Sequence, residues 1–538
     1  MRTDLEVLVV GAGPIGLTTA IALRRLGMRV RVVDRAPGTN REPRADVIFP
    51  RAGEALGALG VGETIRQHAY EMESSTIYSS GRRLGTFTTG RLSSDYPCAM
   101  TIEQHHIERL LTEELAGLGV TVDWRTRVID LEQDEHRVGV TVQRQGEPPE
   151  RVEAAWAVGC DGIRSTVRRL LGVGFPGAER RNMQVVQGNV IPSWSLTDKP
   201  GNGYFFLAPY RSVIAFPTPG CGYRIFCVRD DSQPPETHPP TLPELRDLVA
   251  GAAGIPDLDM VLTEPVWLSR ARFADRIADR LRSGRVLLAG DAAHTWAPLG
   301  GHGMNVGMLG AYNLCWKLAA VHRGQAADDI LDSYDVEQRT LAAGVIRDMR
   351  TSPMEMMLPP IAHRLRGLLL RATLASSAMQ RRVEWMMSDF GRHHRRSPLS
   401  AEPGFRRGLP GGIRAGDRLP AVQVISSGRP VRSHSLLGYD RWTLLHHVRY
   451  AGTEQANALR LALAACPAPV CFAPIAAAGR EAARALGDPA HLLLVRPDGH
   501  VGLICPVDRP DLVRDYARRH LSGTAAVRPV AEVAGGVS

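Results

Sequence analysis

A glycine-rich turn between two apolar segments near the N-terminus restricts the possible folds of this chain most. Residues 5–10 predict a buried strand, and the hexapeptide GAGPIG at 11–16 follows it directly. A helix with one apolar face comes next, and residues 30–33 then predict a second strand that ends at Asp34. A strand, a GxGxxG turn, a helix, a strand and an acid in this order are typical of a dinucleotide-binding βαβ unit.

Each motif residue of this unit has a physical task. Gly11 permits the tight turn, Gly13 lets a pyrophosphate approach the backbone, and Gly16 lets the helix lie close to the sheet. The helix N-terminus offers unpaired N–H groups to the phosphates. Asp34 would accept hydrogen bonds from the ribose hydroxyls, and the alternative is that it only caps a turn. The unit predicts an adenine dinucleotide without separating NAD from FAD.

Length and composition indicate several folded domains. The chain has 538 residues, whereas single domains usually have about 100 to 200. Apolar residues make up 44% and charged residues 22%, which is typical of a globular protein and excludes a disordered one. The net charge of +9 is spread along the chain, which favours an anionic small molecule over nucleic acid as a partner.

The cysteines and the N-terminus bear on the compartment. The eight cysteines form no CxxC pair and no cluster with histidines at zinc spacing, which favours a reduced protein without a structural metal. Charged residues run straight into the first strand and leave no room for a signal peptide, and no apolar run approaches the roughly 18 residues that span a bilayer. We therefore expect a cytoplasmic protein with no membrane span.

Two later segments each predict a buried strand that ends at an acid. Residues 155–160 lead into Asp161 and Gly162, and residues 285–290 lead into Asp291. The glycine-rich sequence PLGGHGMN at 298–305 then opens a long helix. Ligands of such sheets bind beyond the carboxyl ends of the strands, which is where these turns are expected.

Together the three motifs resemble those of the single-component class A FAD-dependent aromatic hydroxylases, typified by p-hydroxybenzoate hydroxylase and phenol hydroxylase. The match comprises the GxGxxG, the Asp161-Gly162 turn, and the stretch from Gly290-Asp291 to the sequence NLCWKLA at 313–319. The subgroup that oxidises phenols and polyketides and has a thioredoxin-like C-terminal domain is the most similar. The resemblance implies an α/β fold, in which a Rossmann-like FAD-binding domain carries an inserted antiparallel β-sheet substrate domain.

The resemblance also implies the reaction. NADPH or NADH would reduce bound FAD, O₂ would add at flavin C4a, and the hydroperoxide would hydroxylate a phenolic or polycyclic aromatic substrate. Most of this chemistry belongs to the cofactor, and the protein supplies placement and exclusion of water. Three alternatives stay open: Baeyer–Villiger oxygenation of a ketone or quinone by the same peroxide, FAD-dependent dehydrogenation, and an accessory protein that binds FAD and a metabolite without turnover.

The residues that hold the cofactor are implied in the same way. Asp291 matches an acid that bonds to the ribityl chain, and the N–H groups of Met304 and Asn305 would lie beside the flavin N1/O2 edge, where the helix dipole stabilises negative charge. Asp161 and Gly162 would serve both FAD and NADPH. The other implied cofactor contacts are Gly11, Gly13, Pro14, Ile15, Gly16, Asp34, Arg35, Arg44, Gln104, Val128, Pro298, Gly301 and Gly303.

No catalytic residue is assigned, and Pro298 and His302 are the candidates placed near the flavin. The family often has Gln where this chain has His302, and Asp where it has Gly310. His302 either titrates near the flavin or simply fits the loop. His294 is placed like a general base, but we expect a structural role for it.

The rest of the chain predicts further domains. The FAD-binding domain is expected at 1–174, with a small substrate-domain insertion near 70–100, and again at 281–407 with bracing helices. Residues 175–280 predict the antiparallel substrate sheet, whose aromatic residues either line a pocket or fill its core. A Pro/Gly-rich linker at 408–416 opens the thioredoxin-like domain at 408–538.

A stretch rich in methionine and arginine, residues 342–396, predicts helices outside the motifs. Such helices either brace the domains, pair two subunits of a homodimer, or bind a membrane surface. The bracing or pairing role is the expected one.

Overall fold

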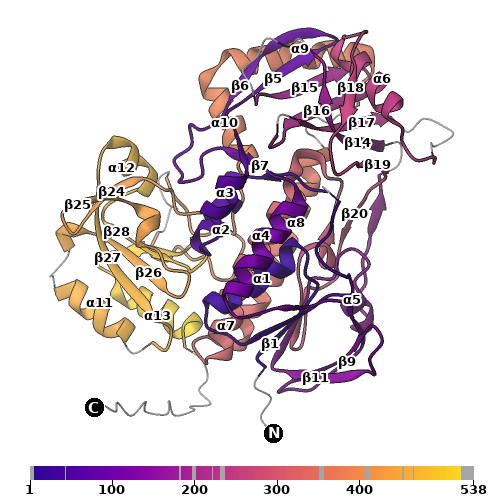
Figure 1. Cartoon of the computed structure of the whole chain (residues 1–538). Coiled ribbons are helices and arrows are strands. Elements are labelled where there is room, and N and C mark those ends of the chain that lie inside the picture. Colours follow the sequence, from indigo (N-terminus) through magenta and orange to yellow (C-terminus); the bar gives the residue numbers. More distant parts are fainter. Residues whose placement is uncertain are drawn as a thin grey trace, which may run out of the picture. The chain divides into compact units, whose positions relative to one another are not determined.

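The computed structural model describes residues 5–42, 44–180, 183–194, 196, 201–220, 222–230, 237–350, 357–405, 412–450, 454–464 and 466–522. The chain divides into two compact units (Figure 1). The first comprises residues 1–315 and 335–393, and the second comprises residues 316–334 and 394–538. Cys221, Met354, Met356 and positions 408–411 of the expected linker lie outside the described residues.

A mainly parallel sheet in the first unit confirms the Rossmann-like prediction. Its described strands run in the order β21-β22-β12-β1-β2-β8. Every residue of β1 is buried, and β1 pairs in parallel with β12 on one side and β2 on the other, as expected for a sheet covered on both faces. The bounds are β21 Arg282–Ser283, β22 Val286–Leu288, β12 Trp156–Gly159, β1 Val7–Val10, β2 Val30–Val33 and β8 Val122–Asp123.

The helices of the βαβ unit lie as the apolar pattern predicts. Helix α1 (Pro14–Arg25) begins directly after the glycine turn, where the fixed φ of Pro14 suits a first helical position. It contacts both β1 and α4 (Gln104–Gly117) and buries most of its residues. Helix α7 (His302–His322) follows the second glycine-rich loop and continues from the first unit into the second.

An antiparallel sheet forms the other large layer of the first unit. Its described strands run in the order β18-β14-β17-β16-β15-β5-β6, and β19 pairs with β14. The strands predicted between residues 185 and 229 all fall within this sheet, and β5 and β6 join it from residues 74–88. The bounds are β18 Met260–Leu262, β14 Met183–Pro192, β17 Tyr223–Asp230, β16 Arg211–Pro217, β15 Gly203–Ala208, β5 Ser74–Ser79, β6 Arg82–Thr88 and β19 Leu268–Ala271.

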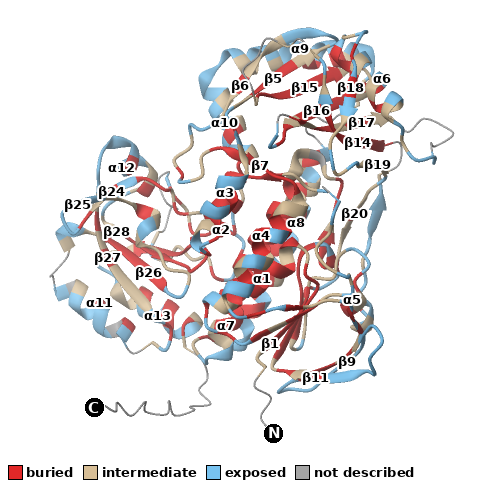
Figure 2. Ribbon diagram, viewed as in Figure 1, coloured by how far each residue is buried: buried red, intermediate tan, exposed pale blue. Residues whose placement is uncertain are grey.

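Helix α6 (Leu242–Ala253) covers one face of this sheet and closes an apolar core (Figure 2). Tyr204 and Phe206 lie in that core and are at most 2% exposed, so they fill the sheet and do not line a pocket. Trp194 and Tyr223 pack against them. The open choice between core and pocket is therefore settled for these four aromatic residues in favour of the core.

Shorter elements complete the first unit. The described strands form three small three-stranded sheets, in the orders β11-β10-β9, β13-β20-β23 and β3-β7-β4. Their bounds are β11 Glu150–Ala154, β10 Val138–Arg144, β9 Thr126–Gln133, β13 Gly177–Glu179, β20 Ala274–Ile277, β23 His294–Thr295, β3 Val47–Ile48, β7 Ala99–Thr101 and β4 Tyr70–Met72. The other helices are α2 Pro50–Ala58, α3 Gly62–His68, α5 Thr166–Leu170, α8 Asp332–Arg350, α9 Pro360–Ala375 and α10 Ser377–Met387.

The second unit has a mixed sheet of its own, as a thioredoxin-like domain requires. In the described part, the strand order is β25-β24-β27-β26-β28-β29, with β26 parallel to β27 and antiparallel to β28. The bounds are β25 Arg429–Arg432, β24 Gln423–Ser426, β27 Val470–Ala477, β26 Trp442–His447, β28 His491–Val495 and β29 Val501–Pro506, with helices α11 Glu454–Ala464, α12 Arg480–Leu486 and α13 Pro510–His520.

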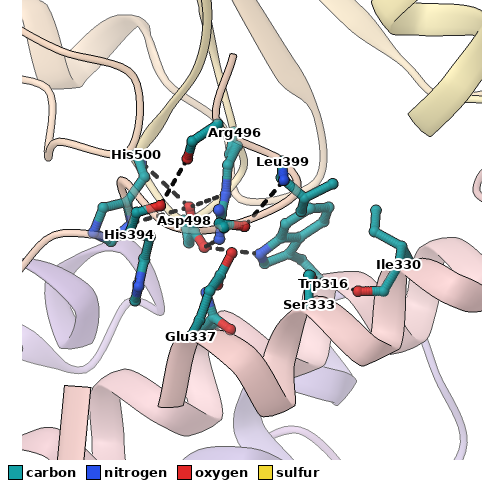
Figure 3. Close-up of polar contacts among 12 residues, drawn as sticks. Trp316, Ile330, Ser333, Glu337, His394, Leu399, Arg496, Asp498 and His500 are labelled. Carbon is teal, nitrogen blue, oxygen red and sulfur yellow. Dashed lines mark hydrogen bonds and ion pairs between the residues drawn. The ribbon is translucent and has the colours of Figure 1, made fainter. Parts of the chain in front are cut away.

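A buried polar network holds the turn between β28 and β29 (Figure 3). Asp498 accepts hydrogen bonds from Trp316 Nε1 at 3.1 Å and from Arg496 Nη2 at 2.5 Å, and its other oxygen lies 3.2 Å from His500 Nδ1. Burial by itself would raise the pKa of Asp498, but Arg496 and His500 outweigh it and hold this pKa well below its ordinary value. The network anchors the turn to the last part of α7 within the second unit.

None of the helices in the described ranges has the length and apolar character needed to cross a bilayer.

Candidate functional site

A cavity of about 1810 Å³ in the first unit is the candidate site. Its wall includes the GxGxxG turn, the Asp161-Gly162 turn, Asp291 and the loop before α7. The opposite part of the wall belongs to the antiparallel sheet, through residues of β14, β16, β17 and β19. The carboxyl ends of β1, β2 and β12 thus lead to this cavity, where ligands of open α/β sheets bind.

The glycine turn fits a dinucleotide phosphate group. A Cβ at Gly11, whose φ is +106°, would lie 2.4 Å from the Cys160 carbonyl oxygen, and one at Gly16 would lie 1.9 Å from the Gly11 carbonyl oxygen. Gly13 differs, because a Cβ there would have no heavy atom within 4 Å. Two glycines are therefore required by close packing, and the third leaves open space at the N-terminus of α1, where a phosphate is stabilised.

Asp34 holds the glycine turn in place. Its carboxylate accepts hydrogen bonds from the N–H groups of Ala12 and Ala36, both at 2.7 Å. Each oxygen keeps a further lone pair, and Asp34 lines the cavity. Capping of the turn and acceptance from a ribose are thus compatible roles of one carboxylate.

Asp161 uses its carboxylate within its own turn. One oxygen accepts from the N–H groups of Thr166 and Val167, at 2.6 and 3.1 Å, and the other accepts from Ser165 Oγ at 2.5 Å. These bonds satisfy the free N–H groups at the start of α5. The turn is rigid as a result, and it presents Gly162, with φ +77°, to the cavity.

Asp291 carries a perturbed carboxyl group. It follows β22 in the short 3₁₀ helix Gly290–Ala292, and its accessible surface faces the cavity. Enclosure by the protein raises its pKa to about 6, although Arg44 acts to lower it. The carboxylate is exposed to the cavity, so it is available to hydrogen-bond donors of a ligand.

Replacing Asp291 by asparagine is expected to stabilise the FAD-free protein at neutral pH. A carboxyl whose pKa rises on folding keeps a proton that the unfolded chain releases, so wild-type stability falls as pH rises from about 4 to about 6. The amide has no such loss, so Asp291→Asn should melt higher than wild type near pH 7.5 and not near pH 4. FAD binding should weaken roughly tenfold, because one acceptor oxygen becomes a donor. Equal melting differences at both pH values would contradict this.

Gln104 and Arg44 both line the cavity. Gln104 Oε1 accepts from the Ala45 N–H at 3.2 Å, and its Nε2 donates to Glu108 at 2.8 Å. Arg44 pairs with Glu42 at 2.9 Å. The other predicted contacts that line the cavity are Gly11, Gly13, Pro14, Ile15, Arg35, Val128, Gly162, Pro298, Gly301, Gly303 and Met304.

Gly16, Asn305 and His302 do not line the cavity. Asn305 is fully buried, and its side chain donates to the carbonyls of Val47 and Gly301 at 2.9 Å and accepts from the Phe49 N–H at 2.7 Å. It therefore fixes the start of α7 from behind. Gly16 is held against the Gly11 carbonyl by close packing.

His302 points to a buried acid. Its Nδ1 lies 3.0 Å from Asp389 Oδ1, and its ring centroid is 4.8 Å from that of Phe49. Burial would raise the pKa of Asp389, but His302 and Arg392 outweigh it and keep this pKa below its ordinary value. Of the two roles considered for His302, this geometry favours that of a histidine that fits the loop over that of a titrating group near the flavin.

His294 lines the cavity but is a weak base. Its side chain is buried, and burial lowers its pKa to about 4. Its ring stacks on Trp296 with centroids 5.1 Å apart. The imidazole is therefore neutral at pH 7, which agrees with a structural role.

The sheet side of the cavity brings together residues that the sequence motifs did not indicate. Arg224 is 3% exposed and donates to the Arg44 carbonyl at 2.6 Å, to Asn189 at 3.0 Å and to Gln187 at 3.1 Å. Its guanidinium lies 4.0 Å from the centre of the Trp267 ring. Burial lowers the pKa of Arg224 to about 10, against the attraction of Asp46 and Glu103. Arg224 therefore stays charged at pH 7.

Aromatic side chains form part of the cavity wall. Phe216, Phe226, Trp267, Phe273 and Trp296 all line the cavity. The sequence signal for Arg224 was its place among the apolar residues that begin the strand YRIFCVRD at 223–230.

Comparison with family models identifies both parts of the chain. Residues 4–349 match the family described as "FAD binding domain", and residues 413–524 match "Aromatic-ring hydroxylase, C-terminal". The first match alone covers more than half of the chain.

Individual proteins agree with these matches. A 6-methylpretetramide 4-monooxygenase of Streptomyces rimosus is 34% identical over 409 residues, which are 73% of this chain and 71% of that protein. The solved structure of the anhydrotetracycline hydroxylase OxyS, also from Streptomyces rimosus, has a TM-score of 0.74 at 29% identity and covers 97% of this chain and 99% of its own. An aklavinone-11 hydroxylase in complex with FAD and aklavinone has a TM-score of 0.77 at 26% identity, with 97% and 99% covered.

Proposed function

This chain belongs to the FAD-dependent aromatic-ring hydroxylases, and from that premise we propose that it hydroxylates a phenolic, polycyclic aromatic molecule of the polyketide type. It is a monooxygenase with FAD as cofactor, and O₂ and a reduced nicotinamide are its co-substrates. The similar proteins act on anhydrotetracycline, aklavinone and pentachlorophenol, as their names state.

The observation that carries the proposal is the extent of the cavity. Its 1810 Å³ exceeds the roughly 300 to 1,000 Å³ of a typical small-molecule pocket, so it has room for a dinucleotide and a second, sizeable ligand. It runs from the glycine turn to the aromatic wall formed by Phe216, Phe226 and Trp267. Flat aromatic rings suit such a wall, because offset and edge-to-face ring contacts add to the apolar burial.

The residues of this chain prepare the site for the cofactor. FAD, when bound, supplies the redox chemistry and the activation of oxygen. We propose that the cavity-lining residues of the predicted set contact it, and that Gly16, His302 and Asn305 act from behind the wall. Asn305 holds the first turn of α7 by three hydrogen bonds, so the N–H groups there are preorganised to stabilise negative charge.

Arg224 and His294 define the electrostatics around the substrate. The buried guanidinium of Arg224 favours the ionised form of a phenol oxygen. The ring of a phenolate is richer in electrons than the ring of the neutral phenol. The neutral His294 brings no competing positive charge and no acidic proton at pH 7. The apolar rings of Trp296 and Phe273 limit the access of water.

The domain division includes the substrate-domain insertion that the sequence predicts near residues 70–100. We assign 1–174 and 281–407 to FAD binding, 175–280 to the substrate sheet and 408–538 to the C-terminal domain, and we count β5 and β6 with the substrate sheet because they pair with it.

We also propose that the protein acts in the reducing cytoplasm. The seven cysteines in the described ranges form no disulfide bond with one another. A homodimer stays a prediction, which sedimentation velocity at micromolar concentration tests directly.

Oxidation of a panel of phenolic polycyclic molecules by the FAD-loaded protein tests the main proposal. We expect NAD(P)H oxidation to accelerate with a substrate, and ¹⁸O₂ to place one labelled atom in a ring hydroxyl. Label in a lactone would instead support Baeyer–Villiger oxygenation, and product without label would support dehydrogenation. Failure to bind FAD at all would contradict every catalytic proposal.

Phe226→Ala is expected to raise the KM for a polycyclic substrate roughly tenfold, because it removes a ring from the aromatic wall. NAD(P)H oxidation should continue, with a larger share of the electrons lost to hydrogen peroxide. Tyr210→Ala is the matched control, since Tyr210 is 48% exposed and outside the cavity wall. An unchanged KM in Phe226→Ala would show that the substrate lies elsewhere.

A further inference from the structure

Helix α9 buries two polar side chains and leaves a stripe of apolar ones outside, while Leu370 and Leu374 pack on the apolar core beneath it. His363 and Arg366 are only 3% and 4% exposed, and His363 Nε2 lies 3.0 Å from Ser79 Oγ beneath the helix. In contrast, Ile361 is 84% exposed and Leu368 is 65% exposed. A surface helix normally exposes polar residues on the side that faces away from the core, so an exposed stripe of large apolar residues is unusual.

The exposed apolar residues form a continuous stripe. Ile361, Leu365, Leu368, Ala372 and Ala375 follow one another at intervals of four and three residues and therefore lie along one side of α9. Leu369 adjoins the stripe and is 62% exposed. We call Ile361, Leu365, Leu368 and Leu369 the apolar ridge.

Helix α10, which contacts α9, adds to this surface. Met379, Trp385 and Met386 are between 44% and 53% exposed. Both helices are coloured largely as exposed in Figure 2. Large apolar patches of this kind are rare on monomeric proteins and mark interaction surfaces.

The exposed charge around the apolar ridge has one sign. In α9 and α10, which are described throughout, the exposed charged residues are all arginines, namely Arg364, Arg371, Arg381 and Arg382. The one acid of these helices, Glu384, is 3% exposed and accepts from the Arg91 N–H at 2.9 Å. The β5–β6 hairpin, on which α9 packs, adds the exposed Arg82 and Arg83.

We propose that the apolar ridge and these arginines dock the protein on an anionic lipid bilayer. Leucine and tryptophan side chains enter the boundary between head groups and acyl chains, while the long arginine stems reach the lipid phosphates. This surface is separate from the cavity, and the inference does not depend on which aromatic substrate is hydroxylated.

Exposure and charge favour a bilayer over a protein partner. A side chain in a groove is shielded by the groove walls, whereas Ile361, at 84% exposed, projects outward. In a two-fold contact between copies, the patch meets itself, and Arg364 and Arg371 would face the same arginines with no exposed acid on α9 or α10 to neutralise them. A fluid anionic surface satisfies both the projecting side chains and the charge.

Sedimentation of the FAD-loaded protein with lipid vesicles tests the proposal. We expect binding to vesicles of mixed phosphatidylcholine and phosphatidylglycerol, at least about tenfold weaker binding to phosphatidylcholine alone, and a decline as salt rises. The double variant Ile361→Gln/Leu368→Gln should bind at least about tenfold more weakly. Arg364→Gln/Arg371→Gln should bind anionic vesicles roughly tenfold more weakly.

The controls separate lipid binding from misfolding. All four replaced side chains are exposed, so flavin content and thermal midpoint should match wild type. Leu461→Gln removes one leucine that is 75% exposed on α11 of the second unit, and it should bind vesicles like wild type. Absence of wild-type binding to either vesicle would overturn the proposal. A wild-type dimer that dissociates in Ile361→Gln/Leu368→Gln would also overturn it. The same holds if the apolar ridge binds an acidic protein and does not bind vesicles.

Discussion

Alanine at position 13 is expected to prevent tight FAD binding and to leave the FAD-free protein folded. Gly13 has φ −73°, which alanine adopts without strain, and the added methyl would meet no heavy atom within 4 Å. The same open space is where the pyrophosphate must approach the backbone in the proposed site, and a methyl there would hold it away. Loss of one or two charge-assisted hydrogen bonds should lower FAD affinity roughly 100-fold.

Flavin titration of the FAD-free protein and its thermal midpoint measure the two effects separately. The matched variant is Gly16→Ala, whose Cβ would lie 1.9 Å from the carbonyl oxygen of Gly11. Neither the new Cβ nor the Gly11 carbonyl oxygen can move away without a shift of the backbone. We therefore expect a loss of about 3 kcal/mol in the free energy of unfolding, with or without FAD. Wild-type FAD affinity in Gly13→Ala would show that the phosphates bind elsewhere, and an unfolded Gly13→Ala would contradict the open space.

Removal of the buried guanidinium in Arg224→Met is the second change with a large expected effect. Arg224 compensates Asp46 and Glu103 and donates to Asn189, Gln187 and the Arg44 carbonyl. Removing one partner of a buried ion pair typically costs about 3 to 5 kcal/mol, because the opposite charges then stay buried without a partner. We expect this loss in urea unfolding, and loss of substrate hydroxylation in any variant protein that remains folded.

The deficit of Arg224→Met should grow with pH. Burial raises the pKa values of Asp46 and Glu103, and Arg224 acts to lower both. Without Arg224 both values rise further. The folded state then keeps protons that the unfolded state releases, so the free energy of unfolding falls as pH rises above the ordinary carboxyl pKa of about 4.

Arg229→Met is the control for Arg224→Met. Arg229 is on the same strand β17, has a side chain 21% exposed and pairs with Glu244 at 3.3 Å. Its replacement should cost about 1 kcal/mol and show no comparable trend with pH. An Arg224→Met deficit that does not change with pH would mean that the pKa values of Asp46 and Glu103 do not depend on Arg224.

Features that depend on neighbouring positions in the chain were predictable. The βαβ unit, the acid after each buried strand and the glycine-rich loop before α7 are all local patterns, and the structure brings their residues to one cavity. The family resemblance added the identity of the cofactor, which the GxGxxG by itself left open between NAD and FAD. The roles of the individual residues at the cofactor stay proposals.

Features that depend on distant contacts were not predictable. The choice of partner for His302 is an example, because Asp389 lies 87 positions further along the chain. The pKa of Asp291 is another, because it follows from enclosure by several segments and from Arg44. The direction in which α9 faces depends on whether the sheet beneath it offers polar or apolar side chains, and Ser79 binds His363 there.

The sequence by itself determined the dinucleotide-binding unit and the order of the elements, because periodicity and turn chemistry act over a few residues. The reaction class came from the resemblance of its motifs to a known family. Only the tertiary structure decided that Arg224 is a buried charge beside the Trp267 ring, that Asn305 and His302 support α7 from behind, and that α9 exposes three of its leucines. Burial, electrostatic enclosure and the facing of a helix are set by segments far apart in the chain, so no local pattern contains them.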